Sequence, residues 1–251
     1  MLKNGFTTCS KVARSFTLSS KNAARQETRT DDRSPLLLVD DADLFAAARR
    51  SAPGSDMLAS YSEAAPPGSD PNDPTRVPFN ILSGTSMSCR HVAGLVGLLK
   101  TLHPHWTPAA IRSAIMSTAQ TLDNTGAAIR SHHGNDATPL SYGSGHIRPN
   151  SAMDPGLVYD LTNADYLDFL CFSGYNTEDM SCFQNYTCPS SRYKLLEDFN
   201  YPAIVFPYHR NLQQTATRRL KNVGSPGTYR IRYRTPAGFN VTVKPESLPY
   251  L

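Results

Sequence analysis

Residues 84–94 read Gly-Thr-Ser-Met-Ser-Cys-Arg-His-Val-Ala-Gly. The apolar run at 77–82 before them predicts a strand, and the residues after them predict a helix that ends by Pro104. Ser86 is therefore expected at the start of a helix, where backbone N–H groups and the positive end of the helix dipole can stabilise an oxyanion. Gly84 permits the tight turn. Many strand-to-helix turns contain a serine, so the turn alone leaves catalytic and structural roles open.

Helices are predicted through the middle of the chain. Residues 92–102 place apolar side chains on nearly every side of a helical wheel, which predicts a buried helix. Thr107 and Pro108 predict the start of a second helix, because they supply a cap and a proline at the first helical position. A third helix is predicted from about Asn163 to Gly174.

After about residue 198 the pattern changes from helical to alternating. Aromatic and aliphatic residues alternate with arginine at 229–234, and Phe239, Val241 and Val243 alternate with polar residues. Alternation predicts half-buried strands, so we expect a separate β-sandwich, which looks incomplete after only a few strands. Residues 1–50 give weaker signals, a short strand at 36–39 and a helix at 42–50.

The composition excludes several classes of protein. The 251 residues are 39% hydrophobic and 18% charged, as in a soluble globular protein with a real core. No run approaches the roughly 20 apolar residues that span a bilayer, so no membrane partner is expected. A net charge of +4 is too small to indicate a nucleic-acid partner. No Cys-x-x-Cys pair is present, which disfavours a zinc site. No metal or cofactor is predicted, and the oligomeric state is left open.

Cysteines and sequons favour a secreted protein. Cys171, Cys182 and Cys188 lie in one loop-rich stretch, which predicts a disulfide from Cys171 to Cys182 or to Cys188, with free thiols as the alternative. Asn185 and Asn240 begin N-glycosylation sequons. The first 20 residues lack the apolar core of a signal peptide. Taken literally, the chain is not addressed for export, which is compatible with secretion if the true N-terminus is absent.

The string at 84–94 resembles the signature around the nucleophile of subtilisin-like serine proteases, Gly-Thr-Ser-Met-x-x-Pro-His-Val-Ala-Gly, with Arg90 as the one clear departure. The resemblance is greatest to the plant, cucumisin-like members, and it extends over segments 52–54, 77–80, 103–104, 109–116, 142–146 and 153–160. It implies an α/β subtilisin-like catalytic-domain remnant over residues 52–190. A fibronectin-III-like β domain, apparently truncated, is implied over 198–251, and residues 1–51 stay unassigned.

By this resemblance Ser86 is the nucleophile of a serine endopeptidase that cleaves protein or peptide substrates through an acyl-enzyme, and its backbone N–H is an oxyanion donor. Gly84, Thr85, Met87 and His91 support the assignment as positions of the motif. The family implies no cofactor and an extracellular location.

The rest of the catalytic machinery is missing from this sequence. Subtilisin places its triad in the order Asp, His, Ser, whereas all seven histidines here follow Ser86. The family's Asp-Thr-Gly, His-Gly-Thr and oxyanion-asparagine segments are absent. His91 lies roughly 140° from Ser86 around the expected helix, which favours a packed, hydrogen-bonded role. The spacing of His132, His133 and His146 does not indicate a base, so we expect the chain as given to be inactive or nearly so.

Three other interpretations remain. A non-catalytic protein-interaction module derived from a subtilase would keep the fold without the chemistry. An α/β-hydrolase would require Gly-x-Ser-x-Gly, and it is disfavoured because position 88 is serine. A soluble protein with a buried serine is the plainest alternative.

Overall fold

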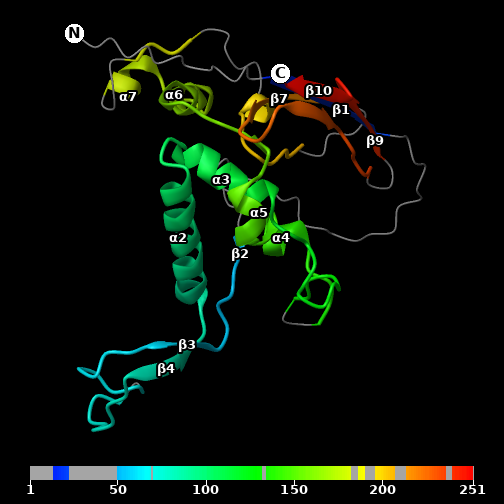
Figure 1. Ribbon diagram of the computed structural model, residues 1–251. Helices are drawn as coiled ribbons and strands as arrows, with labels where there is room; N and C mark the ends of the chain where they lie inside the picture. The colour runs from blue at the N-terminus through cyan, green and yellow to red at the C-terminus, as the bar shows by residue number, and fades with distance from the viewer. Residues whose placement is uncertain are drawn as a thin grey trace, which may run out of the picture.

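The computed structural model of the protein describes residues 14–22, 50–68, 70–131, 134–181, 186–189, 196–206, 213–235 and 239–250. Figure 1 shows a hairpin at one end of the molecule, helices in the middle and a β-sheet at the other end. The expected combination of a helical region and a C-terminal β region is therefore present.

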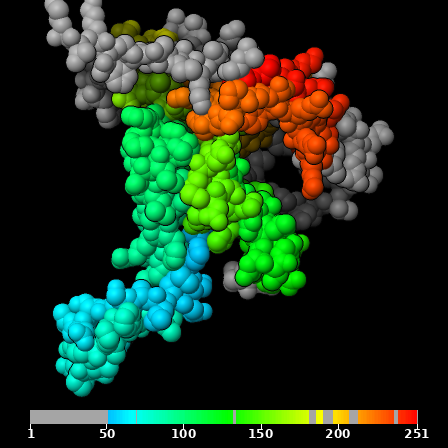
Figure 2. All heavy atoms as spheres, viewed as in Figure 1, coloured from blue at the N-terminus to red at the C-terminus, as the bar shows by residue number. Residues whose placement is uncertain are grey.

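The hairpin consists of β3 (Met57–Ser60) and β4 (Phe79–Leu82), which pair antiparallel. It projects away from the other described residues (Figure 1, Figure 2). Its apolar side chains are open to solvent, and the exposed fractions of Leu58, Phe79 and Ile81 are 70%, 60% and 59%. A two-stranded ribbon without a covering layer buries little apolar area, so the hairpin adds little to any core.

Helix α2 (Thr85–Leu102) follows the hairpin, which confirms the predicted order of strand, serine and helix. The predicted burial of this helix is wrong, because only Leu95 and Leu99 are buried and Leu98 is 63% exposed. Leu95 and Leu99 are four residues apart and so share one side of the helix. Apolar side chains are buried only where another element packs, and here that element lies on one side of α2.

Helix α3 (Pro108–Ser117) begins as predicted. The side chain of Thr107 accepts a hydrogen bond from the N–H of Ala110 at 3.0 Å, and Pro108 is the first helical residue. Seven of the ten residues of α3 are buried. The core that α3 shares with α2 and with α5 (Pro149–Met153) is formed by Leu95, Leu99, Ile111, Ile115, Ile147 and Ala152.

A short parallel pair joins β2 (Arg50–Ser51) to β5 (Gly145–His146), next to α4 (Pro139–Tyr142). Gly145 has φ 118°, and a Cβ there would overlap the main-chain carbonyl of Gln120. The close approach therefore needs glycine. The strand expected at 36–39 lies outside the described residues, as does the helix expected at 42–50, except for residue 50, which is in β2.

Helix α6 (Asn163–Phe172) confirms the third predicted helix. It starts with a capping box, in which the Thr162 side chain accepts from the Asp165 N–H and the Asp165 carboxylate accepts from the Thr162 N–H. Helix α7 (Thr177–Ser181) and the 3-10 turn η1 (Leu196–Asp198) follow. A small core beneath α6 consists of Ala109, Leu161, Phe169 and Phe199.

The largest sheet has four strands in the order β6 (Leu157–Val158), β7 (Gln214–Asn222), β1 (Arg14–Asn22) and β9 (Phe239–Lys244). All neighbours in it are antiparallel. Strand β1 comes from the part of the sequence that gave the weakest signals, and it lies inside the sheet. The β region is therefore not built from C-terminal residues alone.

A second, two-stranded sheet pairs β8 (Gly227–Arg230) with β10 (Ser247–Tyr250). The strand predicted at 229–234 thus forms only as far as residue 230. The core of the β region is formed by Leu220, Val243, Leu248 and Tyr250. Among the described residues, no helix combines the length and hydrophobicity that a membrane crossing requires.

Candidate active site

The turn before α2 presents Ser86 at the surface. Gly84 is the helix cap, with φ 156° and ψ 166°, a conformation that residues with a side chain rarely adopt. Ser86 is the second residue of α2, so it lies in the first turn as predicted. The N–H groups of Met87 and Ser88 both donate to the Gly84 carbonyl, at 3.1 and 3.4 Å. Thr85 and Ser86 are exposed, and Met87 is half-buried.

One loop, residues 52–56, holds this turn in place. The Gly84 N–H donates to the Gly54 carbonyl at 2.7 Å, and the Ser88 hydroxyl donates to the Ala52 carbonyl at 3.0 Å. A Cβ on Gly54 would overlap the Ser88 hydroxyl and approach the Gly84 carbonyl to 2.9 Å. Position 54 therefore requires glycine, because the loop and the first turn of α2 are in contact there.

None of the hydrogen bonds among the described residues joins a histidine to Ser86. His91 Nδ1 contacts the Met87 carbonyl at 3.0 Å, His103 Nε2 the Met153 carbonyl at 2.9 Å, and His146 Nδ1 the Ile147 carbonyl at 3.1 Å. His91 is hydrogen-bonded as expected, but it is exposed rather than packed. His132 and His133 lie outside the described residues.

This arrangement supplies part of a nucleophilic site. A hydroxyl in the first turn of an 18-residue helix has main-chain N–H groups beside it, and these can donate to a developing oxyanion. A serine hydroxyl needs a base to accept its proton, and within the described part of the chain no imidazole is bonded to it. The described residues also contain no cluster of histidine, cysteine and carboxylate side chains that could hold a metal ion.

Two family models match this sequence. The subtilase family matches residues 46–145, which include the Ser86 turn and its supporting loop, and a fibronectin type-III domain matches residues 198–250. The chain belongs to the subtilase family. Subtilisin-like protease SBT5.4 of Arabidopsis thaliana is 52% identical over 204 residues, and subtilisin-like protease Glyma18g48580 of Glycine max is 48% identical over 202 residues.

Each of these matches covers 79% of this chain but 26% of the relative. This subtilase chain therefore spans about a quarter of the length of the relatives that it matches. Subtilisin-like protease SBT5.3 of Arabidopsis thaliana, 47% identical, is covered to the same extent.

The remaining predicted sites in this subtilase chain have different outcomes. Cys171 and Cys188 form a disulfide with Cα atoms 5.7 Å apart, one of the two pairings left open by the sequence. Cys182 and Asn185 lie outside the described residues. Asn240 is exposed on β9.

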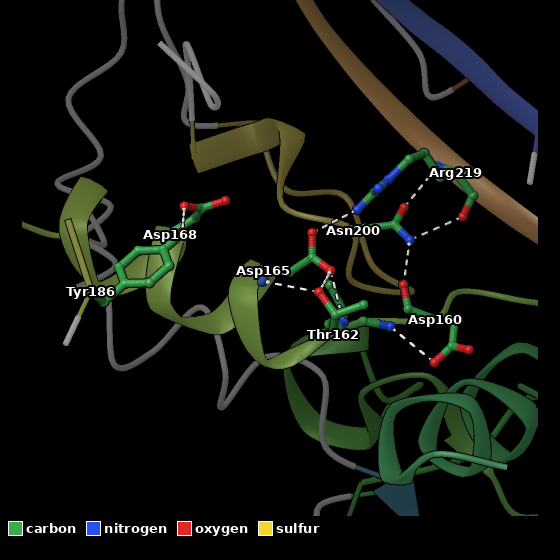
Figure 3. A network of polar contacts seen from close by, with 8 residues as sticks. Asp160, Thr162, Asp165, Asp168, Tyr186, Asn200 and Arg219 are labelled. Carbon is green, nitrogen blue, oxygen red and sulfur yellow. Dashed lines mark hydrogen bonds and ion pairs between the residues drawn. The ribbon is translucent and has the colours of Figure 1, made fainter. Parts of the chain in front are cut away.

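A polar network that the sequence did not reveal connects residues 160–165 to strand β7 (Figure 3). The buried Asn200 donates from its amide nitrogen to the carbonyls of Asp160, at 3.1 Å, and Arg219, at 3.0 Å, and it accepts from the Arg219 N–H at 2.7 Å. The Arg219 guanidinium forms an ion pair with the buried Asp165 at 2.7 Å. Asn200 thus bonds to β7 as a residue of a neighbouring strand would.

Arg218 adds a second connection beside this network. Its guanidinium is buried and donates to four main-chain carbonyls, those of Glu197, Tyr201, Ala203 and Thr217. Burial lowers the pKa of Arg218, and burial also raises the pKa of the nearby Tyr159. The basic run at 218–221 therefore does not form one solvated face, because the alternation of strand β7 turns Arg218 inward and Arg219 outward.

A cavity of about 400 Å³ lies away from the Ser86 turn. It is lined by Met116 of α3, by residues of and after α4, and by residues 202–205, all largely apolar. The lining does not include Ser86, so this cavity does not extend the candidate active site.

Proposed function

We propose that this chain is the part of a subtilisin-like serine endopeptidase that carries the nucleophile, Ser86. The observation that carries the proposal is the position of Ser86 in the first turn of α2, directly after β4 and Gly84, within the residues that match the subtilase family. Residues 52–190 form the subtilase part and residues 198–251 the fibronectin-III-like part of this proposal. Its substrates are proteins or peptides, and its chemistry uses no metal or cofactor.

In the proposed reaction, Ser86 Oγ attacks the carbonyl carbon of a peptide bond and loses its proton to a base. The oxyanion that forms accepts a hydrogen bond from the Ser86 N–H at the start of α2. None of the described residues that are hydrogen-bonded around the Ser86 turn is placed to act as the base or as its carboxylate partner. Other residues must therefore supply both groups. We therefore propose that the chain as given reacts slowly, because loss of a triad member costs several orders of magnitude in rate.

A fluorophosphonate probe tests both parts of this proposal, because it reacts rapidly only with an activated serine. The chain as given should label slowly. A longer chain that adds the family's Asp-Thr-Gly and His-Gly-Thr segments should label at Ser86 at least roughly a thousandfold faster. Ser86→Ala should abolish labelling of the longer chain, and Ser62→Ala, an exposed serine on the hairpin loop, should leave it unchanged. Rapid labelling of the short chain would overturn the proposed inactivity.

A second candidate function is a non-catalytic interaction module. Leu58 and Ile81 favour it, because they are exposed and lie opposite each other on the hairpin, and clustered exposed apolar side chains often mark protein contacts. The same labelling experiment separates the two functions. If the longer chain also failed to react at Ser86, the interaction module would replace the enzyme as the better account.

We further propose an extracellular location. The Cys171–Cys188 disulfide suits an oxidising compartment, and Asn240 is exposed within a sequon. One relative, 41% identical, is named CO(2)-response secreted protease in Arabidopsis thaliana. Expression in a eukaryotic secretory system behind a signal peptide should give a glycan at Asn240 that glycosidase removes and Asn240→Gln prevents. A secreted chain without glycan at this position would contradict the assignment of the sequon.

A further inference from the structure

Strand β1 comes from a part of the chain that neither family match includes. The matches begin at residues 46 and 198, whereas β1 is Arg14–Asn22. It nevertheless lies between β7 and β9 in the four-stranded sheet (Figure 1). Almost 200 residues separate β1 from β7, and β9 lies still further along the chain, so both pairings join segments near opposite ends of the described sequence.

Among the described strands, β1 is the one partner that β7 and β9 share, because they pair with it and not with each other. β7 pairs with β1 from Leu220 opposite Arg14 to Gln214 opposite Ser20. β9 pairs with β1 along its whole length, ending with Phe239 opposite Asn22. Without β1, both strands would present a row of unpaired N–H and C=O groups to the same gap. The gap is therefore a site for one extended strand, with main-chain groups on both sides.

The pattern of β1 matches the burial pattern around it. Ala216 of β7 and Val243 of β9 are buried, and the register places Leu18 between them. The buried Arg218 is opposite Phe16. Phe16 and Leu18 thus occupy alternate register positions, each opposite buried residues of the neighbouring strands, and a slip of one residue would break that correspondence.

The connection between β1 and the rest of the chain is long enough that β1 could fill the gap of its own molecule or the gap of a second molecule. Residues 23–49 connect β1 to β2, and 27 residues can span up to about 90 Å. A tethered strand competes with a free one through its effective concentration, which falls as the connection lengthens. The same main-chain bonds and register are available to a strand from another molecule.

We propose that the gap between β7 and β9 is a strand-acceptor site and that residues 14–22 are an exchangeable occupant of it. The ligand class is an extended polypeptide with apolar residues at the two positions equivalent to 16 and 18. A segment of this kind supplied in trans, for example by a second copy of this chain, binds antiparallel to both edges, with main-chain bonds for affinity and alternate side chains for specificity.

Peptide binding to the full chain tests the site. Leu18→Pro removes an N–H from the middle of β1 and disfavours a central strand, whereas Leu18→Val keeps the pattern. A fluorescein-labelled peptide of residues 12–24 should bind the Leu18→Pro chain at least about tenfold more tightly than it binds the unsubstituted chain, where the tethered strand competes. The Leu18→Val chain should resemble the unsubstituted chain, and the peptide carrying the same proline should bind none of them. Equal, weak binding to all folded chains would overturn the proposal.

Cysteine cross-linking decides the question if Leu18→Pro fails to fold. Thr17 lies opposite Lys244 of β9 and opposite Thr217 of β7. Lys221, the control position, lies four residues further along β7, opposite Val158 of β6. Under mild oxidation, Thr17→Cys with Lys244→Cys should form a disulfide, mapped by mass spectrometry, at least about tenfold faster than Thr17→Cys with Lys221→Cys. Mixing a Thr17→Cys chain with a Lys244→Cys chain should give the same bond between molecules. Absence of the matched bond within one chain would overturn the site, and its absence from the mixture would overturn exchange in trans.

Discussion

Helices α2 and α3 are neighbours in the chain and share one core, yet they differ sharply in burial. Seven of the ten residues of α3 are buried, whereas α2, with 18 residues, buries Leu95 and Leu99. Helix α3 lies among α2, α5 and β6, and α2 has packed neighbours on one side. The difference shows that burial is a property of the neighbours of a helix and not of its own hydrophobicity.

The Ser86 turn and the network around Asn200 also differ in burial. The turn at Ser86 is exposed and is held by one loop, whereas Asn200 is buried and connects residue 160 to β7. The candidate site therefore lies in the less densely packed part of the described chain. The predictions below test that contrast, from the largest expected effect to the smallest.

Adjacent leucines of α2 give the strongest test. Leu99 is completely buried and Leu98 is 63% exposed, so Leu99→Ala should lower the free energy of unfolding by about 2–5 kcal/mol. Leu98→Ala, the matched control, should change it by no more than about 0.5 kcal/mol. Urea denaturation measures both. Similar losses for the two variants would mean that the exposed side of α2 is covered in solution.

Asn200→Ala tests the connection to β7. The substitution leaves the main-chain carbonyls of Asp160 and Arg219 and the Arg219 N–H without their partner, which should cost about 1–3 kcal/mol. Amide hydrogen exchange should show the loss of protection at Arg219. Asn124→Ala, at an exposed position, is the control and should change neither quantity. Unchanged protection at Arg219 would contradict the role assigned to Asn200.

Gly54→Ala tests the support of the Ser86 turn. The new methyl group overlaps the Ser88 hydroxyl, which should destabilise the chain by about 1–3 kcal/mol. Combining it with Ser88→Ala should recover part of the loss, because the overlapping oxygen is removed. Gly97→Ala is the control, since a Cβ there meets nothing within 4 Å and the position is helical, so stability should rise by up to about 1 kcal/mol. Additive losses in the double variant would exclude the contact.

Asp123 provides the smallest effect, in an exposed turn. The Thr125 hydroxyl is the main cause of a lowered pKa at Asp123, and the N–H groups of Thr125 and Ala127 add to it. Because the folded pKa is depressed, the contribution to stability is present above the unfolded pKa and is lost as the pH falls through the folded pKa. NMR titration should show that Thr125→Ala raises the pKa of Asp123. An unchanged titration would mean that the turn is not formed in solution.

Local signals in the sequence were sufficient for much of the fold. The cap at Thr107, the proline at 108 and the alternation at Val241 and Val243 each describe a structure formed by neighbouring residues, and each is observed. Strand β1 was not foreseen, because its partners are almost 200 residues away and no local pattern encodes such pairing. The prediction that α2 is buried was wrong for a related reason, because the burial of a helix depends on which elements pack against it.

The candidate site was predictable at the level of the motif and not of its support. The position of Ser86 followed from the strand before it and the helix after it. The contacts of Gly54 with the Ser86 turn join segments about 30 residues apart, and the motif contains no sign of them. The choice of Cys188 over Cys182 for the disulfide likewise depended on geometry that spacing did not supply.

The buried guanidinium of Arg218 restricts which substitutions the protein tolerates at that position. Four carbonyl groups from segments 197–203 and 217 converge on one planar, forked donor. Lysine would conserve the charge, but its three donors radiate from a single atom and cannot reproduce that fork. In a library of all single substitutions, position 218 should therefore accept arginine alone.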